Sequence, residues 1–260
     1  MTLFSGTYFL LATTLVLAAV IVVTTIRSRA GNWKPQIRRI AGLDSIEEAV
    51  GRATEMGAAV HYTPGLGDIA ADTAPQTFAG LAVMAYVTEL VAKYNTNLIV
   101  TIRNANVFPV AQEMVKNAYM TAGKPDMFQE NTVRFLSNEQ FAYAAAVMGI
   151  MNRENVAANI MMGAFWAESL MFAEAGSQVG AIQVAGTAAM AQIPFFVAAC
   201  DYTLIGEELY AAGAYLSQDA VKLGGIVGQD IIKGLTMVMI LIGSLLATVG
   251  NDALLNLMKM

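Results

Sequence analysis

The chain contains one cysteine, Cys200, and one histidine, His61, among its 260 residues. An intramolecular disulfide is therefore excluded, which fits a reducing compartment. Cysteine and histidine also supply too few ligands for a structural zinc site. A Ser-His-Asp catalytic site would have to use His61, and no nucleophile-elbow motif accompanies it. A lone histidine on an apolar strand is more often a hydrogen-bonded core residue than a base, so we interpret His61 as structural.

Charge is scarce as well, because Asp, Glu, Lys and Arg make up 13% of the residues, against about 25% in an average soluble domain. Hydrophobic residues make up 56%, which indicates membrane spans, a deeply buried domain or both. Five basic residues and no acid lie between residues 27 and 39, whereas residues 40–233 carry 9 basic and 19 acidic residues. So acidic a segment would repel phosphate backbones, and we expect no nucleic-acid partner.

Two long stretches lack charge altogether. Thr7–Ile26 supplies 20 mostly apolar residues, about the length that crosses a bilayer core as a helix. A cleaved signal peptide would carry its basic residues before this stretch, but here they follow it. The positive-inside rule then places the N-terminus outside and the following residues in the cytoplasm.

The second uncharged stretch, Gly234–Asn251, predicts a span that returns the C-terminus outside. The alternative is a buried C-terminal helix of the globular part. Its Gly243-x-x-x-Ala247 spacing offers small residues for close helix contact, with the first span or with a neighbouring subunit.

Between these stretches, short apolar segments alternate with longer helical patterns. This alternation predicts an α/β fold with a doubly wound, mostly parallel sheet of Rossmann-like character. The predicted strands are residues 58–62, 97–103, 132–136, 157–162, 179–185 and 195–200. We therefore divide the chain into an N-terminal transmembrane anchor (1–26), a basic juxtamembrane segment (27–44), a cytoplasmic α/β domain (45–222), and a C-terminal transmembrane helix with a short tail (223–260).

Ligands of parallel sheets bind at the carboxyl ends of the strands, so the loops there are the places to search. After the first predicted strand, residues 65–70 match the relaxed dinucleotide fingerprint G-x-G-x-x-A, with Gly65, Gly67 and Asp68 as candidate binding residues. Two features oppose a nucleotide: the next helix begins only near Pro75, and the second strand ends in Arg103 instead of an acid for a ribose. The alternative is a glycine-rich loop capped by the residues before that helix.

A second candidate site follows the predicted last strand. Asp201 would end that strand, and Glu207 and Glu208 would lie in the first turns of the next helix. Three such carboxylates facing one crevice would suit acid–base chemistry or a Mg²⁺ ion, and Glu168 is a further acid that would join Asp201 across the sheet edge. The alternative is structural, because acids in a first helical turn complement the helix dipole.

Four segments resemble a known family. They are VHYTPGLG near residue 60, FLSNEQFAYAAAVMG from Phe135, VGAIQVAGT from Val179, and CDYTLIGEELYAAGAYLS from Cys200. They resemble an uncharacterised prokaryotic membrane-anchored family, classed as a domain of unknown function, over roughly residues 40–235. The resemblance implies a Rossmann-like body tethered to a membrane. It implies no catalytic residue, cofactor or substrate, so no site is transferred from it.

Two function classes follow from the sequence. The first is a membrane-anchored structural or interaction protein, whose cytoplasmic domain self-assembles or docks a partner complex at the cell membrane; the absence of a catalytic signature favours it. The alternative is a membrane-tethered domain that binds a nucleotide or small molecule, with or without Mg²⁺-dependent chemistry, through Gly65, Gly67, Asp68, Asp201, Glu207 and Glu208. No cofactor or metal is identified by either. A transporter is disfavoured, because neither predicted span carries an intramembrane charge.

Overall fold

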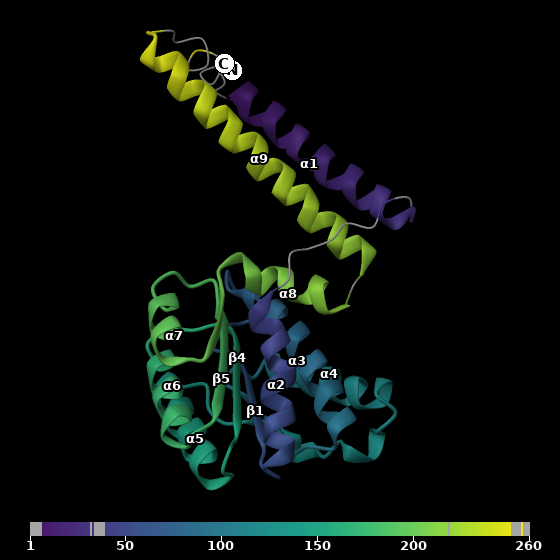
Figure 1. The fold of residues 1–260 in the computed structure, drawn as a ribbon, viewed down its shortest axis with the longest axis vertical. Coiled ribbons are helices and arrows are strands. Elements are labelled where there is room, and N and C mark those ends of the chain that lie inside the picture. The colour runs from purple at the N-terminus through teal and green to yellow at the C-terminus, as the bar shows by residue number, and fades with distance from the viewer. Residues whose placement is uncertain (1–6, 32, 34–39, 218, 251–255, 257–260) are drawn as a thin grey trace. The chain divides into compact units, whose positions relative to one another are not determined.

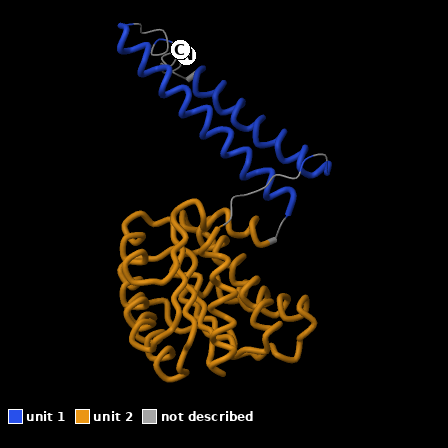
Figure 2. Tube along the Cα trace, viewed as in Figure 1, with its two compact units in different colours: residues 1–38, 217–260 blue, residues 39–216 orange. Residues whose placement is uncertain are grey.

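The computed structural model describes residues 7–31, 33, 40–217, 219–250 and 256. The chain divides into two compact units (Figure 2): residues 39–216, which we call the body, and residues 1–38 with 217–260, which we call the helix pair. Lys34, Arg38 and Arg39 of the predicted juxtamembrane segment lie outside the described residues, as does most of the predicted tail.

The body is built on a six-stranded, entirely parallel sheet with the strand order β3-β2-β1-β4-β5-β6. The chain starts at the centre in β1, moves outward to β3, and then returns to the other side of β1 to build β4 to β6. The strands are β1 (Val60–Gly65), β2 (Leu98–Ile102), β3 (Val133–Phe135), β4 (Ala158–Ala164), β5 (Ile182–Thr187) and β6 (Tyr202–Ile205). The predicted α/β class and doubly wound sheet are confirmed.

Helices cover both faces of the sheet, with α2, α3 and α4 on one side and α5, α6 and α7 on the other (Figure 1). They are α2 (Ala41–Glu55), α3 (Ala74–Tyr94), α4 (Val107–Thr121), α5 (Gln140–Arg153), α6 (Glu168–Gln178), α7 (Ile193–Ala199) and α8 (Glu207–Ser217), with short 3-10 turns at η1 (Pro125–Met127) and η2 (Glu130–Thr132). Because the central strands are covered on both faces, β1, β2, β4 and β5 are buried at every position.

The predicted last strand, residues 195–200, is wrong. This segment belongs to helix α7, and the last strand is β6, which begins at Tyr202. A short apolar run cannot be assigned to strand or helix by periodicity alone. Pro194 stands in the first turn of α7, where its fixed φ favours a helix. Helical geometry also explains why Phe196 is buried while its neighbours Phe195 and Val197 are 43% and 55% exposed.

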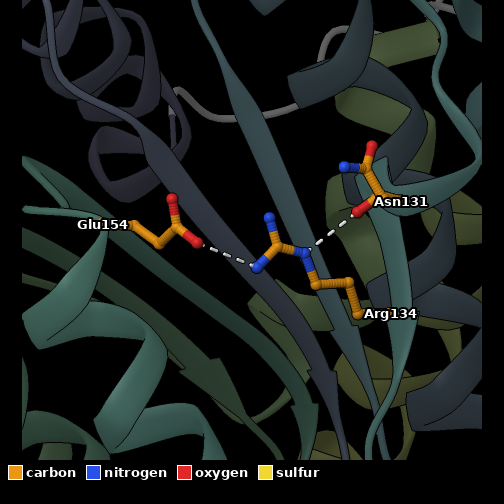
Figure 3. A network of polar contacts seen from close by, with 3 residues as sticks. All are labelled: Asn131, Arg134 and Glu154. Carbon is orange, nitrogen blue, oxygen red and sulfur yellow. Dashed lines mark hydrogen bonds and ion pairs between the residues drawn. The ribbon is translucent and has the colours of Figure 1, made fainter.

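A small polar network secures the edge strand β3 (Figure 3). The Arg134 Nε donates to the Asn131 carbonyl oxygen at 3.0 Å, and its Nη1 contacts the Glu154 Oε1 at 3.1 Å. Glu154 is the C-cap residue of α5, so the ion pair joins β3 to a helix on one face of the sheet. Both side chains are partly exposed, and we expect the pair to stabilise the body by less than about 1 kcal/mol.

The helix pair consists of α1 (Thr7–Arg29) and α9 (Ala220–Thr248), which lie side by side (Figure 1). Both helices are long and apolar enough to cross a membrane. Helix α9 begins 14 residues before the predicted span at Gly234, so Lys222, Asp230 and Lys233 lie on the same continuous helix as the uncharged stretch.

The two helices approach each other closely at Gly224 and Gly228, a small-xxx-small pair that was not among the predicted contact residues. A Cβ added at Gly228 would lie 2.6 Å from the Thr24 Oγ1 and 3.2 Å from the Ile21 Cα. Near the chain connection to the body, the Ser28 hydroxyl donates to the Ala220 carbonyl oxygen at 2.6 Å. These contacts fix the antiparallel register of the pair.

Replacing Gly228 by Leu is expected to force α1 and α9 apart, because a leucine side chain has no room against Ile21 and Thr24. The readout is a disulfide between Ser28→Cys and Ala220→Cys, placed in a Cys200→Ala background. Gly228→Leu should abolish this cross-link. Gly225→Leu is the matched control, because a Cβ at Gly225 meets nothing within 4 Å, and it should leave the cross-link intact. Equal yields from the two variants would contradict the described register.

Candidate functional site

The strand order places the topological switch point between β1 and β4, the position where α/β folds usually bind ligands. The loop that follows β1 meets the end of β4 there, and the Leu66 N–H donates to the Ala164 carbonyl oxygen at 2.8 Å. Gly65, Gly67 and Asp68, three of the predicted candidates, therefore lie at the carboxyl edge of the sheet, as expected.

Internal packing accounts for both glycines. Gly65 has a φ of +81°, and a Cβ there would overlap the Ala164 carbonyl oxygen. A Cβ at Gly67 would overlap the Thr77 hydroxyl of α3 and lie 3.2 Å from the Ala164 Cβ. In a dinucleotide turn the second glycine leaves room for a pyrophosphate and the glycines open the helix. Here α3 begins only at Ala74, and the Thr77 side chain of this helix fills the space beside Gly67.

Asp68 organises the loop after β1. Its Oδ1 accepts from the Ala70 N–H at 3.0 Å, and its Oδ2 accepts from the Asn106 Nδ2 at 3.2 Å. Its own N–H donates to the Thr73 hydroxyl at 3.1 Å. Hydrogen bonds, first from the Ala70 N–H and then from Asn104, hold the pKa of Asp68 below its ordinary value. Asp68 is therefore an ionised carboxylate whose oxygens accept from the protein's own groups.

Arg103, which follows β2, joins three loops at the same edge. Its Nη1 donates to the Leu66 carbonyl oxygen at 3.1 Å, and its Nε donates to the Asn138 carbonyl oxygen at 2.8 Å. Two of its N–H groups are thus engaged with the loops that follow β1 and β3. The guanidinium fixes the loop arrangement around the switch point.

Asp201 lies at the opposite edge of the sheet from Glu207 and Glu208. It precedes β6, and its Oδ2 accepts from the Gln183 N–H, near the start of β5, at 2.7 Å. The two glutamates follow β6, and a strand of four residues is about 13 Å long. The prediction that the three acids line one crevice is therefore wrong, and the cause is the misassigned strand at residues 195–200.

The glutamates at the carboxyl edge have local roles. The Glu208 Oε2 accepts from the Ile205 N–H at 3.2 Å, and exposed Glu207 opens α8, where its charge complements the helix dipole. Glu168 is fully buried at the start of α6, and its Oε1 accepts from the Trp166 N–H at 2.8 Å while its Oε2 accepts from the Gln140 amide. Glu168 follows β4 and does not join Asp201, which precedes β6.

The lone thiol beside Asp201 is not activated. Burial, and secondarily the charge of Asp201, raises the pKa of Cys200 to about 12, so the thiol is neutral at physiological pH. Across the described residues, no three His, Cys, Asp or Glu side chains gather in a way that would hold a metal ion.

A buried row of polar side chains crosses the sheet, and this row was not predicted from the sequence. His61, Asn159 and Gln183 are register partners on β1, β4 and β5. The His61 Nδ1 lies 2.8 Å from the Asn159 Oδ1, and the Asn159 Nδ2 donates to the Gln183 Oε1 at 3.0 Å. The sequence contains a pattern that could have predicted this row. Each of the three is the second residue of an apolar strand and has hydrophobic neighbours on both sides.

The row continues from His61 toward the switch point. The Thr101 hydroxyl lies 2.9 Å from the His61 Nε2 and 3.0 Å from the Tyr143 hydroxyl. The Tyr143 hydroxyl donates to the Thr101 carbonyl oxygen at 3.0 Å and lies 2.7 Å from the Thr63 hydroxyl, which accepts from the Gly65 N–H. Every ring nitrogen and hydroxyl in the row has a partner, so the arrangement specifies strand register and exposes no reactive group.

The carboxyl edge of the sheet is the most apolar exposed region that the structure describes on the body. Its large apolar side chains lie at the last residue of a strand, in the loops after the strands or in the first two turns of the following helices, and we call them together the apolar edge. They are Phe78, Phe135, Phe141, Trp166, Leu170, Met190, Phe195, Val197, Ile205 and Tyr210. Elsewhere on the described body, only Met56 and Met120 are large, apolar and exposed. Patches of this kind mark interaction surfaces.

Acids flank the apolar edge. Asp72 and Glu139 are exposed in the loops beside it, and Glu207 is exposed at the start of α8. Among the described residues of the loops that follow the strands, Arg103 is the one basic residue, and it is engaged with backbone carbonyl oxygens. The apolar edge therefore also carries three exposed acids, which we call the acidic rim.

Comparison with known proteins gives one match. No curated protein and no solved structure matches the chain. A family model does match, over residues 2–258, and its description is a domain of unknown function, DUF6754. This match includes the body and both apolar helices, in the arrangement that the sequence resemblance implied. The chain therefore belongs to the DUF6754 family.

Proposed function

We propose that this protein is a membrane-anchored interaction protein. Helices α1 and α9 cross the cell membrane, with both termini outside and the body in the cytoplasm, and the body docks a partner protein through the apolar edge. The length and low charge of both helices support the anchoring. The basic residues between 27 and 39 support the orientation, because positive charge is retained on the cytoplasmic side.

The observation that carries the docking role is the concentration of exposed apolar side chains at the carboxyl edge of the sheet. Trp166 is 42% exposed, Phe141 64% and Met190 79%, although this is the edge where α/β enzymes gather polar catalytic groups. Aromatic residues and methionine are enriched where proteins bind one another. The acidic rim of Asp72, Glu139 and Glu207 indicates the partner's chemistry, an apolar surface flanked by basic residues.

The alternative, a nucleotide or small-molecule site, has weaker support. The space beside Gly67 is filled by Thr77, and the oxygens of Asp68 accept hydrogen bonds from neighbouring loops. Asp201 lies at the other edge of the sheet and cannot complete the carboxylate group that this alternative requires.

The docking role predicts that polar substitutions at the apolar edge release the partner. Phe141→Ser with Trp166→Ser should shift the protein, extracted from native membranes in mild detergent, from a large complex to a smaller species on native gels. Loss of two such anchors usually weakens binding by more than about 2 kcal/mol, or roughly 30-fold. Raising the salt concentration should weaken the wild-type complex, because the acidic rim contributes to it.

The matched control is Met56→Ser with Met120→Ser, which removes exposed apolar side chains away from the apolar edge. This control should leave the large complex intact. A wild-type chain that migrates as an isolated species would overturn the docking role. Release of the chain from membranes by alkaline washing would overturn the anchoring.

A further inference from the structure

We propose that α9 carries a self-association seam, formed by Asp230, Lys233, Met237, Ile240 and Ser244, that pairs with the same stripe of a second copy of this chain inside the membrane. The inference rests on the proposed membrane anchoring. It concerns the helix pair alone and is independent of the partner that docks on the apolar edge.

The register of the helix pair places the charges of α9 beside the uncharged part of α1. Gly228 contacts Thr24 and Ile21, and the chains run in opposite directions. Asp230 and Lys233 lie two and five residues beyond Gly228, or about 3 and 8 Å further along the axis. They therefore lie beside residues of α1 that precede Ile21, within the charge-free stretch of residues 7–26. A bilayer that covers this stretch of α1 also covers Asp230 and Lys233.

These charges point away from α1. Asp230 lies two residues from Gly228, about 200° around the helix, so it is nearly opposite the glycine that packs on α1. The Lys233 Nζ lies 3.4 Å from the Asp230 Oδ1, and the two side chains are 43% and 61% exposed, respectively. Ionised side chains that face lipid are costly, and membrane proteins bury them against another protein surface. Helix α1 does not cover this pair.

The surrounding residues form a stripe suited to another helix. Positions 230, 233, 237, 240 and 244 are spaced alternately by three and four residues, the a/d pattern of a coiled coil. Met237 and Ile240 on this stripe are 64% and 65% exposed, and Ser244 is exposed. The apolar positions supply packing, and the polar positions fix the register of the paired helices.

The charge pattern indicates a second copy as the occupant. Two copies inserted in the same orientation place their α9 helices parallel. Equal positions face each other in such a seam, and Asp230 and Lys233 occupy neighbouring layers of it, so each carboxylate lies within reach of the Lys233 ammonium groups of both copies. The stripe is thus complementary to itself, as an isologous two-fold interface requires. A lipid-facing role would leave the same pair exposed to hydrocarbon.

The test uses two full-length variants with different tags, expressed together in cells. Asp230→Lys gives a stripe with two positive charges, and Lys233→Asp gives a stripe with two negative charges. Each also carries Met237→Cys and Cys200→Ala, and disulfide formation in isolated membranes is measured. We expect cross-links between unlike chains to exceed those between like chains roughly fivefold or more, since like charges repel across the seam. An ion pair that acts only within one helix is disrupted equally in both variants and predicts no preference.

A second measurement leaves the charges unchanged. In the Cys200→Ala background, Met237→Cys alone should cross-link, whereas Leu245→Cys should not; Leu245 is 69% exposed but lies off the stripe. Equal yields at the two positions, or equal like and unlike yields in the first experiment, would overturn the seam. A chain that stays in the membrane but fails to cross-link overturns this inference alone. A wild-type chain absent from the membrane fraction overturns the proposed anchoring as well.

Discussion

Replacing Gly163 by Ala is expected to lower the free energy of unfolding of the body by about 3–5 kcal/mol, a large share of the roughly 5–15 kcal/mol that stabilises an ordinary protein. Gly163 lies in β4 with a φ of +151°, a conformation that residues with a side chain rarely adopt. An added Cβ would overlap the Pro64 carbonyl oxygen of β1. Neither strand can move away easily, because each is also paired with a second strand on its other side.

The control for this prediction is Gly51→Ala. Gly51 lies inside α2, and a Cβ there meets nothing within 4 Å. Alanine should raise the free energy of unfolding by roughly 0.5–1 kcal/mol, because glycine is the poorer helix former. Thermal melts of the two full-length variants in the same detergent, followed by circular dichroism, give the comparison. A Gly163→Ala protein that melts with the wild type would show that β1 and β4 do not approach so closely.

The importance of Gly163 was not visible in the sequence, because its partner Pro64 lies far away in the chain. Alternating apolar segments and helices were enough to predict the α/β class, since each buried strand is a local pattern. The order of the strands depends on pairing between β1 and β4, a contact over almost 100 residues that no local pattern encodes. The strand predicted at residues 195–200 was wrong because the local pattern itself was ambiguous. Six apolar residues in a row fit a strand and a helix equally well.

The candidate site was predicted in part. Gly65, Gly67 and Asp68 were placed correctly at the carboxyl edge, because a loop after a strand can be identified from sequence. Whether Gly67 faces a ligand or its own helix depends on how far away that helix begins, and this is a tertiary property. The apolar edge was not predicted, because the exposure of Phe141 or Trp166 depends on whether other parts of the fold pack over them, and this too is a tertiary property.

Lowering the pH from 7.5 to 5 is expected to destabilise the body through its single histidine. The pKa of His61 falls from 6.5 to about 4 on folding, first because burial disfavours the charged ring, with a further lowering by the charge of Arg134 that the hydrogen bond to Asn159 partly opposes. The unfolded chain therefore binds a proton between pH 6.5 and 4 that the folded chain does not. Stability from His61 is complete above pH 6.5 and decreases as the pH falls toward 4.

At pH 5 this linkage amounts to about 2 kcal/mol, or a decrease in melting temperature of roughly 4–8 °C for a domain of this size. The measurement is the melting temperature of the full-length protein in one detergent at several pH values between 7.5 and 5. This window lies above the ordinary pKa values of carboxyl groups, and no other histidine contributes to it.

The control variant is His61→Gln, whose amide retains a donor and an acceptor for Asn159 and Thr101 but does not titrate. We expect it to be less stable than the wild type at pH 7.5, because the row is then imperfectly packed. Its melting temperature should fall much less than that of the wild type between pH 7.5 and 5. The slope of melting temperature against pH is the diagnostic quantity, because a purely steric effect of the substitution does not alter it. If His61→Gln kept the wild-type slope, a group other than His61 would take up the proton. The polar row between β1, β4 and β5 would then not be the cause of the lower stability at low pH.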